Sequence, residues 1–211
     1  APIGRARLVG KRAPRVGVLA LQGGFREHEA AMADVGATVI RVGEESDLDD
    51  LEGLLIPGGE STTISLLAQR SGLFDPIRTL VSDGIPVYGS CAGMIMLSDR
   101  VLDGREDRPS FGGIDIAVRR NAFGRQVDSF EADVVMPVIP GDPFPAVFIR
   151  APWVEETTDS VEVLARVADP GSPGRIVAVR QGRLLATSFH PELTPDRRVH
   201  QYFLQIVKGD A

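Results

Sequence analysis

Cys91 stands in a setting that favours nucleophilic chemistry. It lies in the segment Gly89-Ser90-Cys91-Ala92-Gly93, directly after one short apolar run and directly before another. A strand, a tight turn and a helix in this order are typical of a nucleophile elbow, where flanking glycines leave room for the strained turn. The positive end of the helix favours a thiolate, and the N–H of Ala92 points to where an oxyanion would form. An inert buried cysteine is the alternative.

The segment Phe189-His190-Pro191-Glu192 supplies a candidate base and a carboxylate to orient it. It follows an apolar run at residues 184–187, so His190 is expected at the carboxyl end of a strand, where catalytic groups gather in open α/β sheets. Residues two apart in an extended segment point to the same side, which places Glu192 beside the imidazole. Together with Cys91 these residues predict a Cys–His–Glu triad.

A third candidate segment is Pro57-Gly58-Gly59-Glu60-Ser61-Thr62-Thr63, after the apolar residues 54–56. Two glycines allow backbone N–H groups to turn toward a ligand without steric penalty, and the helix that follows adds positive potential. The segment therefore fits a second oxyanion donor and a cradle for a polar substrate, although a plain turn has the same composition. It lacks the Gly-Lys-Ser/Thr sequence of a nucleotide phosphate loop.

The remaining histidines, His28 and His200, fall in helical stretches, and we expect both on solvated helix faces. One cysteine and three scattered histidines give no zinc spacing, so neither a metal nor a cofactor is expected. A single thiol cannot form an internal disulfide and suits a reducing compartment, which predicts a cytoplasmic protein.

Composition indicates an ordinary globular chain. Of the 211 residues, 43% are hydrophobic and 25% are charged, and the net charge is −6. A mildly acidic protein is a poor candidate for sequence-independent binding to nucleic acids or anionic membranes. The sequence also contains no run of about 18 apolar residues that would span a bilayer. We therefore expect neither nucleic acid nor membrane as a partner.

The apolar pattern predicts a scaffold for these residues. In the first half, strands are expected at residues 16–21, 38–42, 54–56 and 86–88, and helices at 25–35, from 61 or 62 to 70, from 75 onward and at 92–97. Such alternation with short connections indicates a parallel sheet covered by helices. The second half holds strand-like segments at residues 114–118, 130–135, 146–149, 161–167, 176–179 and 184–187. Some of these extend the sheet, others form a small antiparallel annex, and a last helix runs from about 195 to 207.

The chain is expected to form one domain preceded by a tail. Residues 1–14 carry four basic side chains and no acidic one, which predicts a flexible basic tail, with a basic arm for a partner as the alternative. No linker between residues 16 and 207 is long enough to separate two domains. We therefore assign residues 15–211 to a single domain.

At this level of detail the sequence resembles a known family. The Gly-Ser-Cys-Ala-Gly segment, followed about a hundred residues later by Phe-His-Pro-Glu, resembles the class I (triad) glutamine amidotransferases. Further segments at residues 19–23, 26–28, 57–63, 120–126 and 148–152 are similar to the glutaminase subunits of pyridoxal 5′-phosphate synthases. The resemblance spans about residues 15–207. It departs from that pattern at Gly24, a position to which we assign no chemical role.

The resemblance implies a three-layer α/β/α fold with a mostly parallel sheet, and hydrolysis of L-glutamine to L-glutamate and ammonia through a thioester on Cys91. It implies oxyanion donors at Gly59 and Ala92, and a partner-sensing role for Gln22. It also implies glutamine contacts, which by motif match are Gly58, Gly59, Glu60, Arg120, Ile149 and Arg150. Ammonia would pass to a synthase subunit that makes pyridoxal 5′-phosphate from ribose 5-phosphate and glyceraldehyde 3-phosphate.

Other functions remain open at this stage. The chain could be the glutaminase of another amidotransferase, a cysteine hydrolase of similar fold, a non-catalytic redox sensor using Cys91, or an inactive regulatory subunit. The Leu-Gln-Gly segment at residues 21–23 and the segment at 120–126 favour the vitamin B6 branch. An inactive subunit would be free to lose His190 or Glu192, and both are present.

Overall fold

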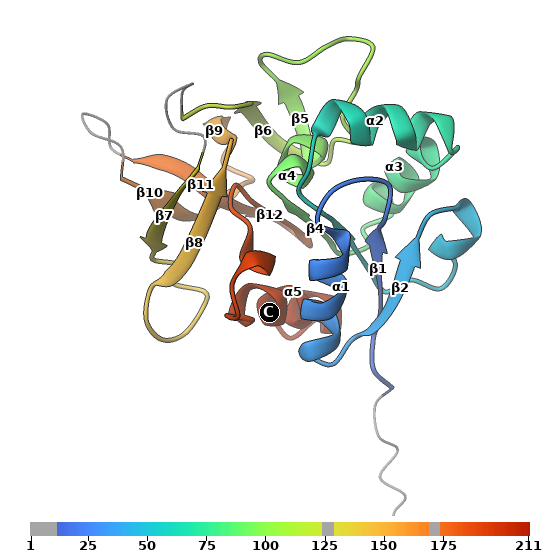
Figure 1. Cartoon of the computed structure of the whole chain (residues 1–211), viewed down its shortest axis with the longest axis horizontal. Helices are drawn as coiled ribbons and strands as arrows, with labels where there is room; N and C mark the ends of the chain where they lie inside the picture. Colours follow the sequence, from blue (N-terminus) through green and yellow to red (C-terminus); the bar gives the residue numbers. More distant parts are fainter. Residues whose placement is uncertain (1–11, 124–128, 169–173) are drawn as a thin grey trace, which may run out of the picture.

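The computed structural model describes residues 12–123, 129–168 and 174–211 (Figure 1). Its elements are β1 (Arg15–Leu19), α1 (Phe25–Asp34), β2 (Thr38–Val42), η1 (Glu45–Leu48), β3 (Gly53–Ile56), α2 (Ser61–Arg70), α3 (Phe74–Ser82), β4 (Val87–Ser90), α4 (Ala92–Leu97), β5 (Ser98–Val101), β6 (Ile114–Arg119), β7 (Ser129–Val134), β8 (Phe144–Ile149), β9 (Trp153–Thr157), β10 (Glu162–Val167), β11 (Arg175–Gln181), β12 (Leu184–Thr187), η2 (Pro191–Leu193) and α5 (Arg198–Lys208).

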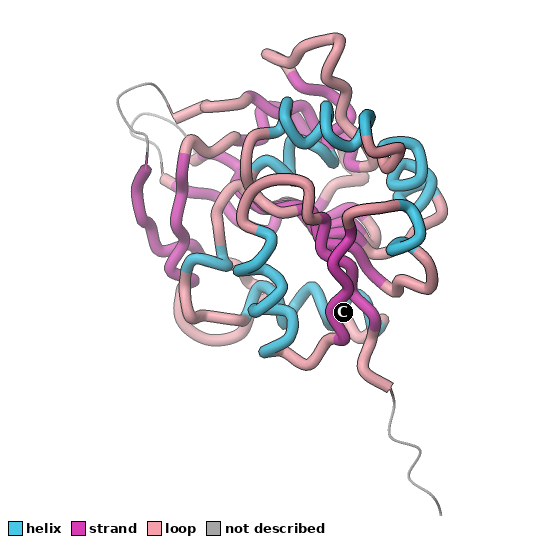
Figure 2. Tube along the Cα trace, turned by 45° about the vertical axis from the view of Figure 1, so that its right-hand side comes forward, coloured by secondary structure: helices cyan, strands magenta, loops and turns pink. Residues whose placement is uncertain are grey.

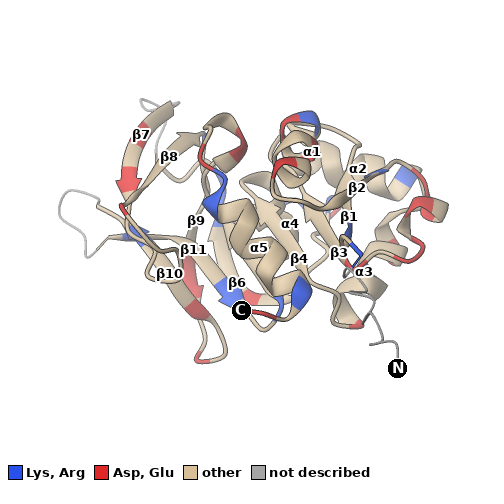
Figure 3. Ribbon diagram, turned by 90° about the horizontal axis from the view of Figure 1, so that it is seen from below, with Lys and Arg blue, Asp and Glu red and all other residues tan. Residues whose placement is uncertain are grey.

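Ten strands form one sheet in the order β2-β1-β3-β4-β12-β11-β9-β6-β5, with β10 paired to β11. The five strands from β2 to β12 are mutually parallel, as the alternation of strands and helices predicts. β12 comes from the far end of the chain and pairs with β4, so that Thr187 lies opposite Ser90. Strands β3 and β4 carry no charged residue (Figure 3), as expected for strands covered on both faces.

Helices cover both faces of the sheet, which confirms the three-layer arrangement. Alternate residues of β3 enter two separate apolar clusters: Leu54 and Ile56 face one side, and Leu55 faces the other. Helices α2, α3 and α4 pack in the first cluster, and α1 and α5 pack in the second. Figure 1 shows α1 and α5 next to each other, at the opposite face from α2 and α3.

The antiparallel annex is also present, as a separate two-stranded sheet of β7 and β8. In the annex, the aromatic rings of Phe130 and Phe148 stack with their centroids 4.6 Å apart. These rings belong to the same cluster as α1 and α5, so the annex extends that layer of the molecule. Figure 2 shows it at the end of the molecule away from α2 and α3.

Three elements differ from the expectation. Strands β5 and β9 were not predicted: β5 lies at the edge of the sheet with Asp99 and Arg100 exposed, and β9 has an alternation too weak to stand out. The last helix begins at Arg198 and not near Pro195, because Arg197 adopts a non-helical backbone conformation as its N-cap.

Most of the expected tail, residues 1–11, lies outside the described residues. The described part of that segment contacts the domain: the carbonyl of Pro14 accepts a hydrogen bond from the Thr38 N–H, and Arg12 forms an ion pair of 3.2 Å with Glu52. Within the described ranges, every helix is too short or too polar to cross a bilayer.

Candidate active site

Four adjacent parallel strands deliver the predicted site residues to one edge of the sheet. Gln22 follows β1, Gly58 follows β3, Cys91 follows β4, and His190 follows β12. The carboxyl ends of parallel strands lie at the same edge, which is where ligands bind in open α/β sheets. Residues separated by more than 160 positions in the chain therefore meet in one place.

Cys91 occupies the strained turn that its sequence context predicts. Its φ of 53° and ψ of −104° lie in a region that side-chain-bearing residues rarely adopt. The glycines on either side are sterically required. A Cβ on Gly89 would lie 2.3 Å from the carbonyl oxygen of Gly93, and a Cβ on Gly93 would lie 2.3 Å from that of Ile56. Because Ala92 is the first residue of α4, its N–H has no acceptor within the helix.

His190 and Glu192 meet, although not in the extended segment that we expected. Residues 191–193 form the 3-10 turn η2, which begins with Pro191. Proline suits the first position of such a turn, since its φ is already helical and its missing N–H would have no partner. Within the turn, Nδ1 of His190 lies 2.7 Å from Oε1 of Glu192. The N–H of His190 donates to the carbonyl of Val147 in β8, so the annex also positions the base.

The charge state of His190 depends on its two neighbours. Burial alone would lower the pKa of the imidazole. Hydrogen bonds and charge interactions with Cys91 and Glu192 outweigh burial and raise the pKa of His190 to about 10. The imidazole is thus placed to hold a proton between a thiol and a carboxylate. That geometry allows a thiolate–imidazolium pair, the reactive form of a cysteine nucleophile.

The glycine segment after β3 lies directly against this pair. A Cβ on Gly58 would lie 2.4 Å from Cε1 of His190 and 3.4 Å from Cβ of Cys91. The segment is held by the loop after β1 at two points. The Gly58 carbonyl accepts from the Gly24 N–H at 3.0 Å, and the Glu60 N–H donates to Oε1 of Gln22 at 2.8 Å.

A cavity of about 440 Å³ opens above Cys91. Most of the residues predicted to act on glutamine line it. The lining residues are Gln22, Gly59, Glu60, Ser61, Cys91, Ala92, Ile95, Arg120, Asn121, Ile149, Arg150 and His190. Two predicted residues lie behind this wall: Gly58 packs against His190 and Cys91, and Glu192 is reached only through His190.

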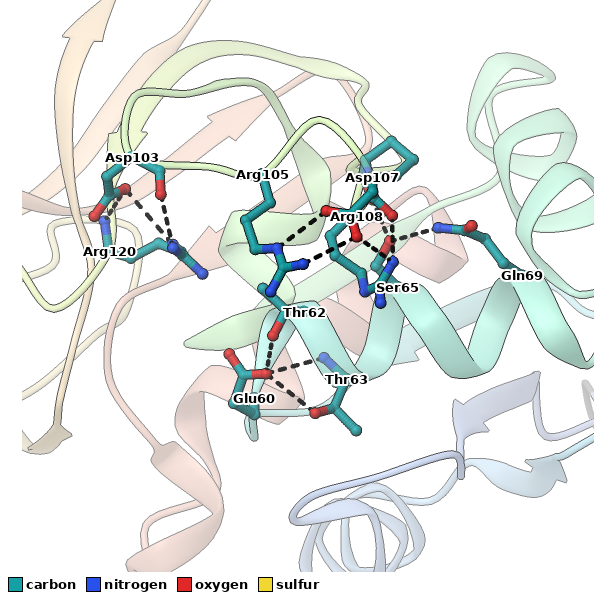
Figure 4. A network of polar contacts seen from close by, with 11 residues as sticks. Glu60, Thr62, Thr63, Ser65, Gln69, Asp103, Arg105, Asp107, Arg108 and Arg120 are labelled. Atoms are coloured by element: carbon teal, nitrogen blue, oxygen red, sulfur yellow. Dashed lines mark hydrogen bonds and ion pairs between the residues drawn. The ribbon is translucent and has the colours of Figure 1, made fainter.

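Glu60 has a structural contact as well as a place on the cavity wall (Figure 4). Its Oε2 accepts hydrogen bonds from the Thr63 N–H and from the hydroxyls of Thr62 and Thr63, so Glu60 is the N-cap of α2. Burial opposes ionisation of Glu60, but these hydrogen bonds outweigh it and lower the pKa of the carboxyl. Glu60 is therefore a fixed negative charge at the cavity.

Arg120 and Arg150 bring positive charge to the same cavity. The backbone N–H of Arg120 donates to Oδ1 of Asp103, and its Nη2 donates to the Asp103 carbonyl at 2.7 Å (Figure 4). Arg150 directly follows β8, has a φ of 42° and is exposed. Its neighbour Ile149 presents its carbonyl 3.8 Å from Sγ of Cys91. The remaining residues of the predicted 120–126 segment after Phe123 lie outside the described residues.

Sequence reasoning missed part of this site. Ser61, Ile95 and Asn121 line the cavity, and Asp103 holds Arg120. Gly24, to which we assigned no chemical role, lies against the site, since a Cβ there would be 3.4 Å from Oε1 of Glu192. Ser61 belongs to the predicted glycine segment, but the loop that carries Asp103 contains no pattern that would single it out.

The expectation for His28 and His200 was wrong. Both residues are fully buried, and Nδ1 of His28 lies 2.8 Å from Nε2 of His200. The helical period contains the signal for this: in α1 the buried residues Ala31 and Met32 follow His28 by three and four positions. In α5, Phe203 and Leu204 follow His200 at the same spacing. Residues at these spacings share one helix face, so both histidines point inward.

The described residues include no group of three or more His, Cys, Asp and Glu side chains that could hold a metal ion. The polar side chains that line the cavity carry a thiol, an imidazole, one carboxylate, two guanidinium groups, two amides and a hydroxyl. This set matches acyl transfer, in which a nucleophile, a base and oxyanion donors act on a carbonyl carbon.

Comparisons with known proteins agree with this chemistry. The chain is 60% identical over 197 residues to the pyridoxal 5′-phosphate synthase subunit PdxT of Salinispora tropica, covering 93% of this chain and 98% of that protein. It is 58% identical to the same subunit of Rhodococcus jostii, again covering 93% and 98%. A crystal structure of a glutamine amidotransferase superposes with a TM-score of 0.84 at 46% identity, over 92% of this chain and 98% of that one.

A more distant structural match shows that the fold is shared more widely. A chain of the PurLQS structure from Thermotoga maritima superposes with a TM-score of 0.65 at 19% identity, over 94% of this chain and 97% of that one. The model of the SNO glutamine amidotransferase family matches residues 18–208, which include the elbow, the glycine segment and the turn that carries His190. The resemblance expected from the sequence is thus confirmed, and the chain belongs to the SNO glutamine amidotransferase family.

Proposed function

We propose that this chain hydrolyses L-glutamine to L-glutamate and ammonia, with Cys91 as nucleophile, His190 as general acid and base, and Glu192 orienting His190. One observation carries the proposal. Cys91 and His190 share a single cavity with the candidate oxyanion donors and with two arginines, and Glu192 lies 2.7 Å behind the imidazole. Acyl transfer needs these groups together in one place.

The first half of the reaction forms a thioester. Sγ of Cys91 attacks the side-chain amide carbon of glutamine, a C–S bond forms, and the carbonyl electrons move to the oxygen. The N–H groups of Gly59 and Ala92 are the proposed donors to that oxyanion. His190 gives its proton to the amide nitrogen, the C–N bond breaks, and ammonia leaves.

The second half releases glutamate. His190, now neutral, takes a proton from a water molecule as the water oxygen attacks the thioester carbon. The C–S bond breaks, glutamate leaves, and the thiolate–imidazolium pair forms again. Glu192 stabilises the imidazolium in both halves and holds the ring in the required tautomer.

Opposite charges on the cavity wall are the proposed basis for recognition of an amino acid. The guanidinium groups of Arg120 and Arg150 are the proposed partners of the α-carboxylate. Glu60 is the proposed partner of the α-ammonium, because its hydrogen bonds to α2 all involve Oε2 and leave Oε1 for the substrate. Ile149 completes the proposed contact set on the cavity wall, and Gly58, which lies behind that wall, supports it by packing against His190 and Cys91.

We further propose that the ammonia passes to a synthase subunit that makes pyridoxal 5′-phosphate from ribose 5-phosphate and glyceraldehyde 3-phosphate. The support is the name of the relatives at about 60% identity, which are subunits of pyridoxal 5′-phosphate synthase. Gln22 is the proposed partner-sensing residue, because it joins the loop after β1 to the glycine segment through the Glu60 N–H.

The test is to measure glutamate release by the wild type and by Cys91→Ala, both with the synthase subunit present. Turnover should fall by on the order of 10⁴-fold or more in the variant, the range for loss of a triad member. A glutamine analogue with an electrophilic side chain should add one covalent label to the wild type and none to Cys91→Ala, since Cys91 is the only thiol. Near-normal turnover in a folded Cys91→Ala protein would refute the proposed nucleophile.

A further inference from the structure

Two histidines outside the cavity form a buried polar chain behind the base. His28 in α1 and His200 in α5 both have no exposed surface, and neither lines the cavity. Nδ1 of His28 lies 2.8 Å from Nε2 of His200. On its other side, Nε2 of His28 lies 3.2 Å from Oε2 of Glu192. The chain His200–His28–Glu192–His190 thus runs from the interface of two helices to the edge of the cavity.

The positions of the protons on the two buried imidazoles follow from counting their donors and acceptors. Burial is the main reason that the pKa of His28 is held well below its ordinary value, and burial likewise lowers the pKa of His200 to about 3. Each ring is therefore neutral and carries one N–H. A carboxylate can only accept, so an attractive contact with Glu192 requires the proton of His28 on Nε2. Nδ1 of His28 is then bare and accepts from the Nε2–H of His200.

This assignment accounts for the polar atoms that would otherwise have no contact. Among the described residues, neither Nε2 of His28 nor Oε2 of Glu192 has a regular hydrogen bond, and the polar contact that the structure shows for both atoms is their 3.2 Å approach to each other. Unpaired buried donors are rare in folded proteins, because each costs the full desolvation of its N–H. Two other atoms of these four described side chains also lack a regular hydrogen bond: Nδ1 of His200, which is bare and needs no acceptor, and Nε2 of His190, which faces the cavity.

The other charged or titratable groups near the pair do not compete for these atoms. Arg197, at the start of α5, and Asp34, at the end of α1, act on the histidines only through charge. They are occupied with each other, through a 2.9 Å ion pair. The Tyr88 ring meets both imidazoles edge-on with centroids 6.3 Å away, and its hydroxyl hydrogen-bonds Thr187. Cys91 lies on the far side of His190.

We propose that His28 is a positioning residue of the hydrolytic site, and that His200 fixes the tautomer of His28 for this purpose. His28 holds Oε2 of Glu192 while His190 uses Oε1, so the carboxylate cannot rotate away from the base. Nδ1–H of His190 then stays on Glu192, and Nε2 stays available to the thiol and the substrate. The inference rests on the proposed function, since it assigns His28 to the same reaction.

The test compares His28→Gln with His28→Asn in the presence of the synthase subunit. A Gln amide nitrogen reaches the position of Nε2 and can still donate to Glu192. An Asn amide nitrogen reaches only the position of Nδ1, so it contacts His200 and leaves Oε2 without a donor. We expect His28→Asn to lower kcat by about ten- to a hundredfold, the range for outer partners of a functional histidine, with KM changed less than about twofold. His28→Gln should restore most of kcat.

A second measurement separates this inference from the proposed function. Alkylation of Cys91 by iodoacetamide needs no glutamine, and Cys91 is the only thiol. In His28→Asn the acid limb of the pH–rate profile for alkylation should move to higher pH, because a carboxylate no longer held beside His190 stabilises the imidazolium, and with it the thiolate, less well. In His28→Gln the limb should stay in place. If the wild type hydrolyses no glutamine but the two variants still differ in their alkylation profiles, the proposed function is refuted and the positioning role stands.

The inference is overturned if folded His28→Asn matches the wild type in both kcat and alkylation profile, or if His28→Gln is as impaired as His28→Asn. Thermal unfolding of each variant establishes that it is folded before it is assayed. In α5, His200→Gln keeps a donor toward His28 and should retain kcat, whereas His200→Met removes that donor and should lower kcat. Equal activity of these two variants would show that His200 does not contribute to the positioning of Glu192.

Discussion

Asp103 controls where the guanidinium of Arg120 lies. Its carboxylate accepts from the Arg120 backbone N–H at 2.9 Å and lies 3.7 Å from Nε, while its carbonyl accepts from Nη2. Both side chains are partly exposed, so the ion pair by itself contributes little to stability. Its consequence is geometric: the charged group that we assign to the substrate α-carboxylate is held in place before glutamine arrives.

We expect Asp103→Ala to raise KM for glutamine by about two- to tenfold, which corresponds to one lost hydrogen bond at a partly solvated site. The turnover number should change less, because Arg120 is remote from the reacting carbon. Asp107 provides a matched control in the same loop, since its ion pairs within the described part of the chain are with Arg105 and Arg108 at the surface. Steady-state kinetics that show equal KM for Asp103→Ala and Asp107→Ala would contradict this assignment.

At the scale of elements, α4 approaches β3 so closely that only glycine fits between them. A Cβ on Gly93 would lie 2.3 Å from the backbone oxygen of Ile56, a group that cannot move without displacing its strand. We expect Gly93→Ala to lower the free energy of unfolding by at least about 2 kcal/mol.

Gly43 is the control for that substitution, because a Cβ there meets nothing within 4 Å. Gly43→Ala should leave stability unchanged or raise it by up to about 1 kcal/mol, since alanine restricts the unfolded chain. Urea unfolding of the two variants gives the comparison. Similar midpoints for Gly93→Ala and the wild type would show that α4 can shift away from the sheet.

The packing of α1 against α5 should make stability depend on pH. His28 and His200 have lowered pKa values in the folded state and an ordinary value of about 6.5 when unfolded. Below that value the unfolded chain binds protons that the folded chain excludes, so stability falls as pH falls. Each histidine contributes about 1.4 kcal/mol per pH unit once its unfolded form is fully protonated. His190, with its raised pKa, stays protonated in the folded state across this range and does not add to the loss.

Urea unfolding of the wild type and of His200→Gln between about pH 6 and pH 5 measures this dependence. The free energy of unfolding should depend less steeply on pH in the variant, by up to about 1.4 kcal/mol per pH unit, because glutamine does not titrate. An unchanged slope would mean that carboxyl groups elsewhere set the acid sensitivity.

Elements with a strong apolar signal could be predicted from the sequence, and those defined by their neighbours could not. β12 and α4 have the predicted bounds, because each is a mostly apolar run ended by a turn or a change of pattern. β5 carries exposed Asp99 and Arg100, and becomes a strand only because β6 lies beside it.

The site shows the same division. Cys91 and His190 could be identified from local segments, because an elbow and a strand end are local features. Asp103 and the inward faces of His28 and His200 depend on which elements pack together, so the chemistry of a short segment does not reveal them.

At the scale of the whole molecule, we expect the isolated chain to be a poor glutaminase that becomes active when the synthase subunit binds. Ammonia released into neutral water is protonated and ceases to be a nucleophile, so hydrolysis without an acceptor wastes glutamine. The Gly58–Gly59 peptide is the proposed switch, since glycine lets a peptide rotate at low steric cost. A flip would break the hydrogen bond between the Gly58 carbonyl and the Gly24 N–H.

The expected stimulation is on the order of 10²-fold in kcat, the effect of one oxyanion donor. Glutamate release by the purified chain, alone and with saturating synthase subunit, measures it. Gln22→Ala should reduce the stimulation, since it cuts the link from the loop after β1 to Glu60. Full activity of the chain on its own, unchanged when the synthase is added, would rule out the switch and indicate a free-standing glutamine hydrolase.

The pairing of β4 with β12 also determines when a newly made chain can assemble the proposed site. The hydroxyls of Tyr88 and Thr187 are 2.8 Å apart in space and 99 positions apart in sequence. Cys91 leaves the ribosome early, but His190 follows only after the annex and β11 have been made. Long-range strand pairing is slow because the intervening loop must close first. An incomplete chain therefore carries the proposed nucleophile without the proposed base.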